Sequence, residues 1–330
     1  MGLDVTPVGR SAVGKDGRED SPSILFFPVK SFAVSRENMS EINYSIVIPH
    51  KDIPQLLQRC LDSIPLRRDT QVVIVDDDSD PATVDFDRFP GAGRPDTEVY
   101  FTKEGKGAGY ARNIGLAHAR GKWIIFADAD DFFTPCFDEM LDRYQDAEYD
   151  IVYFKVTSVD SQTMLPHTRH LQINSCLSKI QETHDWSFCV LMTSVWARFI
   201  KRDLLKQNNI VFQETAVAND TLFSAKLAML DLNRVISENI IYCVTHRDGS
   251  LEGNRNIGSL KTRFEISCHA YRFLKKSKKA NYYYAACGYW WMEAFFKNRL
   301  IGVRLLPELF ATCGIYYGVK GVFWAFDGRR

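Results

Sequence analysis

The 330-residue sequence has no net charge and lacks several patterns that would place it quickly in a class. Lysine plus arginine and aspartate plus glutamate each number 41, which argues against a nucleic-acid-binding protein that works by general phosphate attraction. The eight cysteines form no C-x-x-C pair, as expected for reduced thiols in a cytosolic protein. No transmembrane helix is predicted, because charges interrupt the longest apolar stretches near the C-terminus, at Arg304, Glu308 and Lys320.

The N-terminal segment, residues 1–38, also lacks a clear structural pattern. Its short apolar patch, ILFFPV, does not follow the basic, apolar and small-residue order of a signal peptide. We interpret residues 1–38 as a disordered extension or as the product of a mis-assigned start, since Met39 directly precedes the first convincing strand. The rest is long enough for one large α/β domain with an added subdomain, or for two domains.

From residue 44 onward the sequence alternates between strand-like and helix-like segments. Helices are predicted over residues 53–64 and 107–120, where apolar residues recur at helical spacing. The predicted strands are short and mostly apolar, at residues 44–49, 71–76, 97–102 and 123–128. Repeated β-α-β units predict a mostly parallel sheet with right-handed crossovers.

Asp52 is predicted to cap the first of these helices. Pro54 falls in the first turn, and Gln55 stands three residues after Asp52, where a glutamine completes a capping box. The sequence therefore predicts that this helix begins directly after Asp52.

Two acidic clusters follow predicted strands. DDDSD, residues 76–80, ends the second strand, and DADD, residues 128–131, ends the fourth. Because ligands of open α/β sheets bind outside the carboxyl ends of the strands, both clusters are expected at one binding rim. A carboxylate there could accept from a base or ribose, while another holds a divalent cation beside a diphosphate. Each cluster alone is more often a solvated or capping turn.

A longer pattern connects the two clusters. A strand ending in V-D-D-x-S is followed by a G-x-x-x-A-R-N-x-G-L helix and then by a D-x-D-D turn with a proline close behind. In order and spacing this resembles glycosyltransferase family 2, over roughly residues 44–250. The residues that carry the resemblance are Val75, Asp76, Asp77, Ser79, Gly107, Ala111, Arg112, Asn113, Gly115, Leu116, Asp128, Asp130, Asp131 and Pro135.

The resemblance implies a GT-A fold, which is an α/β nucleotide-diphospho-sugar transferase architecture with a Rossmann-like mixed sheet. It further implies a nucleotide-sugar donor, with UDP favoured, a divalent Mn²⁺ or Mg²⁺ ion, and inversion at the anomeric carbon. Asp77 or its neighbour Asp76 would meet the base or ribose, and Pro49 is expected to line the same nucleotide site.

The resemblance also gives the D-x-D turn its role. Asp128 and Asp130 would meet ribose and metal, with Asp130 the better metal candidate and Ala129 between them in the donor site. The bound cation would stabilise the negative charge that develops on the leaving diphosphate. Asp131 is expected mainly to support the turn.

Inverting transfer also needs a general base to accept the proton of the acceptor hydroxyl. The family usually supplies an aspartate from an E-D pair at the start of a later helix, and the matching pair here is Asn219 and Asp220. The resemblance therefore makes Asp220 the catalytic candidate. The alternative is structural, with Asn219 capping the helix and Asp220 favouring its dipole.

Three further residues have two readings each. Arg112 could reach the diphosphate or brace the D-x-D turn. His246 and Arg247, with Ser250, match a loop that closes over the donor diphosphate in related enzymes, but they are also compatible with a solvated turn.

Residues 39–256 are thus expected to form the GT-A catalytic domain, and residues 257–330 a C-terminal helical region rich in aromatic and basic residues. Such a composition fits helices at a membrane interface, which would make the protein peripheral on the inner face of the cell membrane. It equally fits a helical subdomain that packs on the catalytic core and exposes its lysines.

The sequence therefore predicts a cytoplasmic inverting glycosyltransferase that moves a sugar, with a UDP-hexose favoured, to a saccharide or lipid-linked acceptor in cell-surface polysaccharide synthesis. A sugar-phosphate nucleotidylyltransferase is less well supported, because IPHKDIP replaces the Gly-rich basic loop expected after the first strand. A non-catalytic sugar-nucleotide-binding scaffold is the other alternative.

Overall fold

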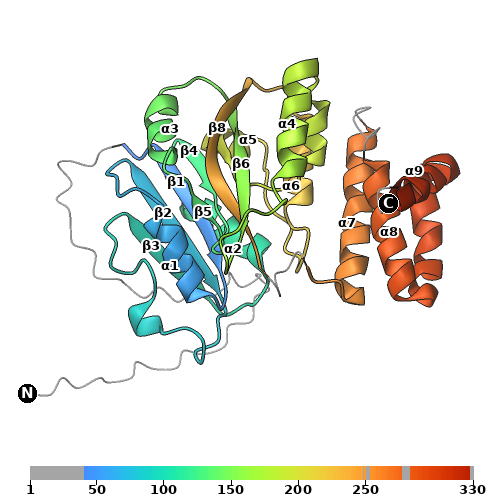
Figure 1. The fold of residues 1–330 in the computed structure, drawn as a ribbon, viewed down its shortest axis with the longest axis horizontal. Helices are drawn as coiled ribbons and strands as arrows, with labels where there is room; N and C mark the ends of the chain where they lie inside the picture. Colours follow the sequence, from blue (N-terminus) through green and yellow to red (C-terminus); the bar gives the residue numbers. More distant parts are fainter. Residues whose placement is uncertain (1–40, 248, 250–252, 277–282, 328–330) are drawn as a thin grey trace, which may run out of the picture.

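The computed structural model describes residues 41–247, 249, 253–276 and 283–327, so the N-terminal segment 1–38 lies outside the described residues. A mixed sheet forms the centre of this part of the chain, with the strand order β3-β2-β1-β4-β7-β6-β8-β5 (Figure 1). The strands are β1 (Tyr44–His50), β2 (Thr70–Asp77), β3 (Thr97–Thr102), β4 (Trp123–Phe126), β5 (Phe132–Phe133), β6 (Ile151–Asp160), β7 (Arg198–Lys201) and β8 (Arg234–His246).

The four strands predicted from the sequence are confirmed, and they pair in parallel as β3-β2-β1-β4. Val47 of β1 stands beside Val73 of β2 and Phe126 of β4, which sets the register of the central strands. Beyond β4 the sheet becomes mixed, because β7 runs antiparallel to both β4 and β6. The GT-A expectation of a mixed sheet followed by C-terminal helices is therefore met.

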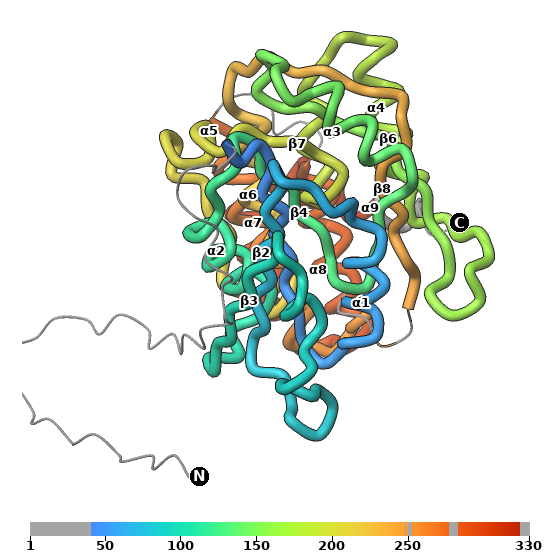
Figure 2. The backbone as a smooth tube through the Cα atoms, turned by 90° about the vertical axis from the view of Figure 1, so that its left-hand side faces the viewer, coloured from blue at the N-terminus to red at the C-terminus, as the bar shows by residue number. Residues whose placement is uncertain are grey.

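Helices cover both faces of the sheet, and alternate strand residues supply the two apolar layers. Val47 and Val73 face one layer, whereas Ile46 and Val72 face the other. Figure 2 shows α1 and α2 on opposite sides of the parallel strands. The helices of this part are α1 (Pro54–Asp62), α2 (Ala108–His118), α3 (Phe137–Tyr144), α4 (Leu171–Thr183), α5 (Arg202–Gln207) and α6 (Thr221–Met229), with short 3-10 turns η2 (Phe86–Arg88) and η3 (Trp186–Leu191).

The predicted capping box of the first helix is wrong. The residue at the N-cap is Ile53, and no side chain caps the helix there. Asp52 instead takes a positive φ of 57° and uses its carboxylate to accept from the backbone N–H of Asp80, 2.7 Å away. A contact with the distant loop after β2 therefore outweighs the local capping signal.

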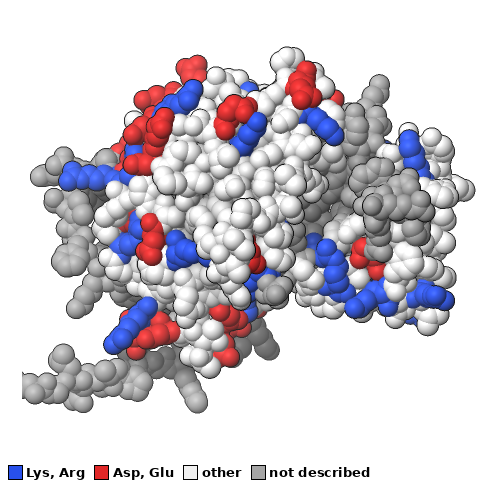
Figure 3. Space-filling view, in the orientation of Figure 1, with Lys and Arg blue, Asp and Glu red and all other residues white. Residues whose placement is uncertain are grey.

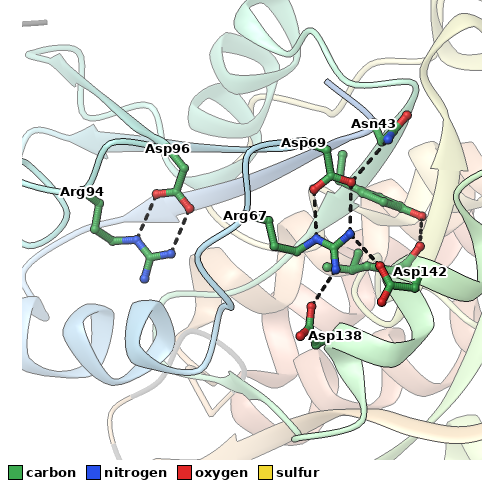
Figure 4. A network of polar contacts seen from close by, with 9 residues as sticks. Asn43, Arg67, Asp69, Arg94, Asp96, Asp138 and Asp142 are labelled. Carbon is green, nitrogen blue, oxygen red and sulfur yellow. Dashed lines mark hydrogen bonds and ion pairs between the residues drawn. The ribbon is translucent and has the colours of Figure 1, made fainter. Parts of the chain in front are cut away.

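A network of charged side chains lies at the edge of the sheet where β1 and β2 begin, opposite the strand ends that are followed by the acidic clusters (Figure 4). Arg67 donates to the carboxylates of Asp69, Asp138 and Asp142 at 2.8–2.9 Å, which ties the start of β2 to α3. Burial alone would raise the pKa of Asp69, but hydrogen bonds from Arg67 and Asn43 outweigh it and hold that pKa below its ordinary value.

Three long helices stand together beside the sheet at the right of Figure 1: α7 (Ile257–Lys275), α8 (Tyr284–Lys297) and α9 (Arg299–Asp327). Glycines let α8 and α9 approach closely, since a Cβ on Gly288 would come within 2.3 Å of the backbone of Gly321. α7 packs against α6, the helix that begins after Asp220.

The sequence predicts no transmembrane helix, but residues Arg299–Phe323 of α9 are long and apolar enough to cross a membrane by length and composition. The helix is interrupted within this stretch, because Gly314 has non-helical angles of φ 76° and ψ 161°. Each half, residues 299–313 and 315–327, is shorter than the roughly 20 residues that a spanning helix needs.

Candidate active site

Two aspartates at the carboxyl end of β2 have all their carboxylate oxygens engaged. Asp76 receives hydrogen bonds from His50 Nδ1 at 2.6 Å and from the hydroxyl and backbone N–H of Ser79. His50 Nε2 accepts from the backbone N–H of Ile53, so the ring takes the neutral form protonated at Nδ1. The carboxylate of Asp76 thus anchors the loops after β1 and β2, and Pro49 is buried in β1 just before His50.

Asp77 supports the start of α2. Its carboxylate accepts from the hydroxyl of Thr102 at 2.7 Å and from the backbone N–H of Gly107 at 2.5 Å. Gly107 is the N-cap residue of α2 and has φ 91°, a conformation that favours glycine. The next residue, Asp78, is exposed and has φ 63°, and aspartate tolerates this left-handed region better than most residues.

The Arg112 side chain joins two parts of the site that are far apart in sequence. It donates through Nη2 to Asp128 at 2.5 Å and through Nη1 to Asn219 at 2.8 Å. Arg112 is 6% exposed and lies over the ring of Phe212. The contact with Asp128 braces the D-x-D turn, and the contact with Asn219 places that turn beside the start of α6.

The D-x-D turn is held by backbone contacts to its neighbours. The backbone N–H of Asp128 donates to the Tyr242 hydroxyl at 2.8 Å, and Asp131 accepts from the backbone N–H of Thr245 at 2.7 Å. The carbonyl of Asp130 accepts from Thr245 and, at 2.6 Å, from the guanidinium of Arg59 in α1. These contacts leave the side chains of Asp128 and Asp130 partly exposed, with Ala129 buried between them.

Negative charge accumulates on this turn. Burial, with the neighbouring charge of Asp128, raises the pKa of Asp130. Burial and the charges of Asp130 and Asp128 raise the pKa of Asp131 well above its ordinary value. The Arg247 Nε, 3.5 Å from Asp130, only partly offsets this accumulation.

The pair of carboxylates fits a divalent cation that takes its other ligands from a diphosphate and water. Among the residues that the structure describes, no group of three or more His, Cys, Asp or Glu side chains is arranged to hold a metal ion. Mg²⁺, however, usually binds through one or two carboxylates plus substrate phosphates. Asp128 and Asp130 therefore have suitable chemistry for Mn²⁺ or Mg²⁺ bound together with the donor.

Asp220 is the N-cap residue of α6, yet its carboxylate makes no capping hydrogen bond. Burial raises its pKa, the charge of Arg112 opposes that rise, and Asp128 adds to it. Asn219 does not cap the helix either, because its side-chain oxygen accepts from Arg112. The geometry therefore leaves the Asp220 carboxylate uncommitted to helix capping, close enough to Asp128 to sense its charge.

The end of β8 contributes to the same rim. The ring of His246 stacks on that of His167 with 4.3 Å between centroids, and Arg247 approaches Asp130. Ser250 of the expected loop lies outside the described residues. The sequence did not point to Arg59, Tyr242 or Thr245, because each acts through contacts with residues at least 71 positions away.

Comparisons with known proteins agree with this architecture. The family model "Glycosyl transferase family 2" matches residues 45–208. EpsJ of Bacillus subtilis (strain 168), an uncharacterized glycosyltransferase, is 26% identical over 52% of this chain and 51% of its own length. TarS of Staphylococcus aureus (strain MW2), a poly(ribitol-phosphate) beta-N-acetylglucosaminyltransferase, is 25% identical over 63% of this chain and 36% of its own length.

The chain thus spans about half the length of the former relative and about a third of the latter. Among solved structures, S. aureus TarS 1-349 in complex with UDP-GlcNAc matches with a TM-score of 0.57 and 19% identity, covering 82% of this chain and 80% of that one. At this identity the structural match concerns the fold. Together with the family match, it leads to one assignment: the chain belongs to glycosyltransferase family 2 and has the GT-A fold.

Proposed function

We propose that this chain is an inverting glycosyltransferase that moves a sugar from a nucleotide diphosphate sugar to a hydroxyl group of a saccharide or lipid-linked oligosaccharide. The observation that carries the proposal is the double contact of Arg112, which joins Asp128 to Asn219 and so brings Asp220 to the D-x-D turn. Groups suited to the donor phosphates and to the acceptor proton then lie on one rim of the sheet.

The nucleotide would lie along the ends of β1 and β2. Lys51 donates to the backbone carbonyls of Asp77 and Asp78. These hydrogen bonds fix the loop after β2, which would contact the base and the ribose. Asp77 shapes this loop through Gly107, at the start of α2. The UDP-GlcNAc named in the TarS complex supports a UDP-sugar as the donor of this chain.

The diphosphate would lie against the D-x-D turn. Asp128 and Asp130 would hold Mn²⁺ or Mg²⁺, which supplies positive charge to the leaving group. Arg247 contributes a second positive charge at the same place, 3.5 Å from the carboxylate of Asp130. When the nucleotide leaves, Arg112 keeps the carboxylate of Asp128 in position for the next donor.

Asp220 would accept the proton of the acceptor hydroxyl. Burial raises its pKa, which makes the carboxylate a stronger base than an exposed aspartate, and the charge of Arg112 opposes part of that rise. A non-catalytic scaffold would not need a half-buried carboxylate at the start of α6 that makes no capping hydrogen bond.

The acceptor would belong to a cell-surface polymer, such as a capsular or lipopolysaccharide chain or a wall polymer. The name of TarS, a poly(ribitol-phosphate) beta-N-acetylglucosaminyltransferase, supports this class of acceptor.

The C-terminal helices would hold the enzyme at an anionic lipid surface on the cytoplasmic side of the membrane. Residues 257–330 contain 13 Lys and Arg against 4 Asp and Glu, a net charge of +9, whereas residues 1–256 contain 28 against 37, a net charge of −9. Basic side chains outnumber acidic ones over these helices in Figure 3.

Apolar side chains accompany this charge on α9. Leu300 and Ile315 are each 74% exposed, and Phe323 is 66% exposed. Exposed apolar and basic side chains together are typical of helices that lie in the headgroup region rather than across the bilayer. The break at Gly314 suits an interfacial position, since neither half of α9 needs to span the membrane.

Donor turnover tests the enzymatic part. The protein is incubated with a panel of nucleotide sugars and Mn²⁺ or Mg²⁺, and nucleotide release is measured with and without chelator. We expect one UDP-sugar to be hydrolysed and the chelator to stop the reaction. Absence of release with every donor, in a folded protein that binds UDP, would favour the scaffold reading.

Vesicle flotation tests the membrane part. We expect binding to vesicles that contain phosphatidylglycerol and little binding to pure phosphatidylcholine. The double change of Ile315 and Phe323 to serine should weaken binding, whereas Leu66→Ser, at a residue 63% exposed in the sheet region, should not. Equal binding by all three proteins would remove α9 from the contact.

A further inference from the structure

A basic concavity of about 590 Å³ lies at the edge of the sheet opposite the D-x-D turn. β1 and β4 begin beside it and β7 ends in it. Lys122 and Asp128 are six positions apart on the segment that contains β4, which is roughly 20 Å at about 3.3 Å per residue, so the concavity is separate from the donor site. Its charged lining consists of Arg120, Lys122, Lys201, Arg202, Glu41 and Asp203.

Two lysines, Lys122 and Lys201, line this concavity, and the charge of Lys122 acts on Lys201. Each donates to a backbone carbonyl at 3.0 Å, Lys122 to Gln145 and Lys201 to Ala147. Lys201 Nζ also lies 3.9 Å from the centre of the Trp123 ring. The backbone carbonyls and the ring face are favourable partners for the ammonium groups, but they do not neutralise two like charges.

Arg67, another cation near this edge of the sheet, has a different environment. Arg67 has three carboxylates within 2.9 Å. In the described part of the chain, neither Lys122 nor Lys201 has a carboxylate within ion-pairing distance, and Asp146 and Asp150 act on Lys201 only at longer range. In this part of the chain, the positive charges of Lys122 and Lys201 are therefore not neutralised by an ion-paired carboxylate.

The ionisation of Lys201 agrees with this geometry. Burial, together with the neighbouring charge of Lys122, lowers the pKa of Lys201 to about 8. A bound anion would remove this penalty, because an opposite charge within a few ångströms favours the charged form of lysine.

Two guanidinium groups extend the positive lining toward solvent. Arg202 donates to the carbonyl of Arg120 at 2.5 Å, which holds the two side chains on the same wall. The Arg120 side chain is 53% exposed and pairs with Glu98, and that of Arg202 is 36% exposed. With Glu41 and Asp203 counted, four cations face two carboxylates, a net lining charge of +2.

We propose that this concavity is a second anion site that binds a phosphate group carried by a sugar or polyol. A phosphate offers several oxygens to the two ammonium groups at once, and a guanidinium can bind two of them. The volume lies within the roughly 300–1,000 Å³ typical of small-molecule sites, which leaves room for the group that carries the phosphate. The site does not depend on the proposed transferase activity.

The test uses the full-length protein with saturating UDP and Mg²⁺, so that the donor site is occupied. Inorganic phosphate and glycerol 3-phosphate are titrated separately, with calorimetry for affinity and the indole N–H resonance of Trp123 as a local reporter. We expect saturable binding of both, tighter for glycerol 3-phosphate, and a shift of the Trp123 signal. Tighter binding of inorganic phosphate would contradict the expectation of a carried phosphate.

Charge variants distinguish this site from others. The double change of Lys122 and Lys201 to glutamine should weaken binding at least tenfold. Lys206→Gln, an exposed lysine on α5 outside the concavity, is the matched control and should change nothing. If the double variant does not fold, Arg120→Gln on the exposed wall should still weaken binding severalfold. Unchanged affinity in the folded variants, or phosphate binding that UDP abolishes, would overturn the proposal.

Discussion

The sheet region and the C-terminal helices differ in charge, in surface and in their relation to known proteins. Residues 1–256 carry a net charge of −9 and residues 257–330 a net charge of +9. The family match, residues 45–208, lies entirely in the first region. In that region the acidic side chains at the rim are bound to specific partners, whereas α9 presents apolar side chains to solvent. We infer that the sheet region carries the chemistry and the helices determine where it takes place.

The two regions nevertheless meet at the helix that begins with the candidate base. Tyr283, just before α8, is 4% exposed, and burial, with the charges of Cys287 and Asp220, raises its pKa. α7 packs on α6 from the same side. In the described residues, the helical region thus supports the position of Asp220, while the hydrogen bonds of the D-x-D turn come from α1, α2 and β8.

Asp220→Asn should have the largest effect and should be confined to the chemistry of the sheet region. We expect transfer to fall by roughly 10²–10⁴-fold while donor binding persists, because the amide cannot accept the acceptor proton. In the wild type, the acid limb of the kcat/KM profile should lie above pH 3.8, since the pKa of Asp220 is raised from that value. Transfer rates and UDP-sugar calorimetry test both points.

Asp231→Asn is the matched control for that substitution, because Asp231 is exposed just after α6. It should retain full transfer. Near-normal transfer by Asp220→Asn would remove this residue as the base.

Arg112→Lys should have the second-largest effect. A lysine keeps the charge but cannot hold Asp128 and Asn219 at once in the geometry of a guanidinium. We expect kcat to fall about 10–100-fold, with a stability loss of about 1–3 kcal/mol from a buried hydrogen bond left unmade. Transfer assays and urea unfolding measure the two effects, and Arg88→Lys on the exposed surface is the control.

Arg67→Gln should affect the stability of the sheet region but not transfer. Loss of hydrogen bonds to charged groups should cost about 2 kcal/mol at pH 7. The pKa of Asp69 is held below 3.8 in the folded protein, so this stabilisation is present above that pH and is lost as the pH falls through the lowered pKa. The difference in unfolding free energy between wild type and variant should therefore be complete at pH 7 and should shrink as the pH falls below 3.8.

The parallel half of the sheet could be predicted from the sequence because its signals are local. Each of β1 to β4 is a short apolar run, and the acidic turns after β2 and β4 follow directly from the chain order. The mixed half, in which β6 pairs in parallel with β8 but β7 and β5 pair antiparallel, could not be predicted in the same way. The place of β7 between β4 and β6 depends on pairing of segments such as residues 123–124 with 200–201, which no local pattern specifies.

The candidate site likewise contains residues that local motifs predict and residues whose roles depend on distant contacts. The D-x-D turn and Asp220 could be named from motifs, whereas the role of Asn219 could not. Its partner Arg112 lies 107 residues away, and the local sequence suggests only a helix cap. Asp52 failed as a cap for a similar reason, since the loop after β2 takes its carboxylate. Spatial contacts between distant segments thus decided the residues that sequence patterns left ambiguous.

Glu308→Gln should have the smallest effect and should show how differently the helical region uses its charges. Arg272 and Glu308 pair between α7 and α9 with side chains 44% and 42% exposed, whereas the side chain of Arg67 is only 18% exposed. Solvent and salt screen such an exposed pair, so we expect a change below about 1 kcal/mol that disappears in 1 M NaCl. Urea unfolding at low and high salt measures it. A loss as large as that of Arg67→Gln, persisting in salt, would show that the two regions depend on ion pairs to a similar degree.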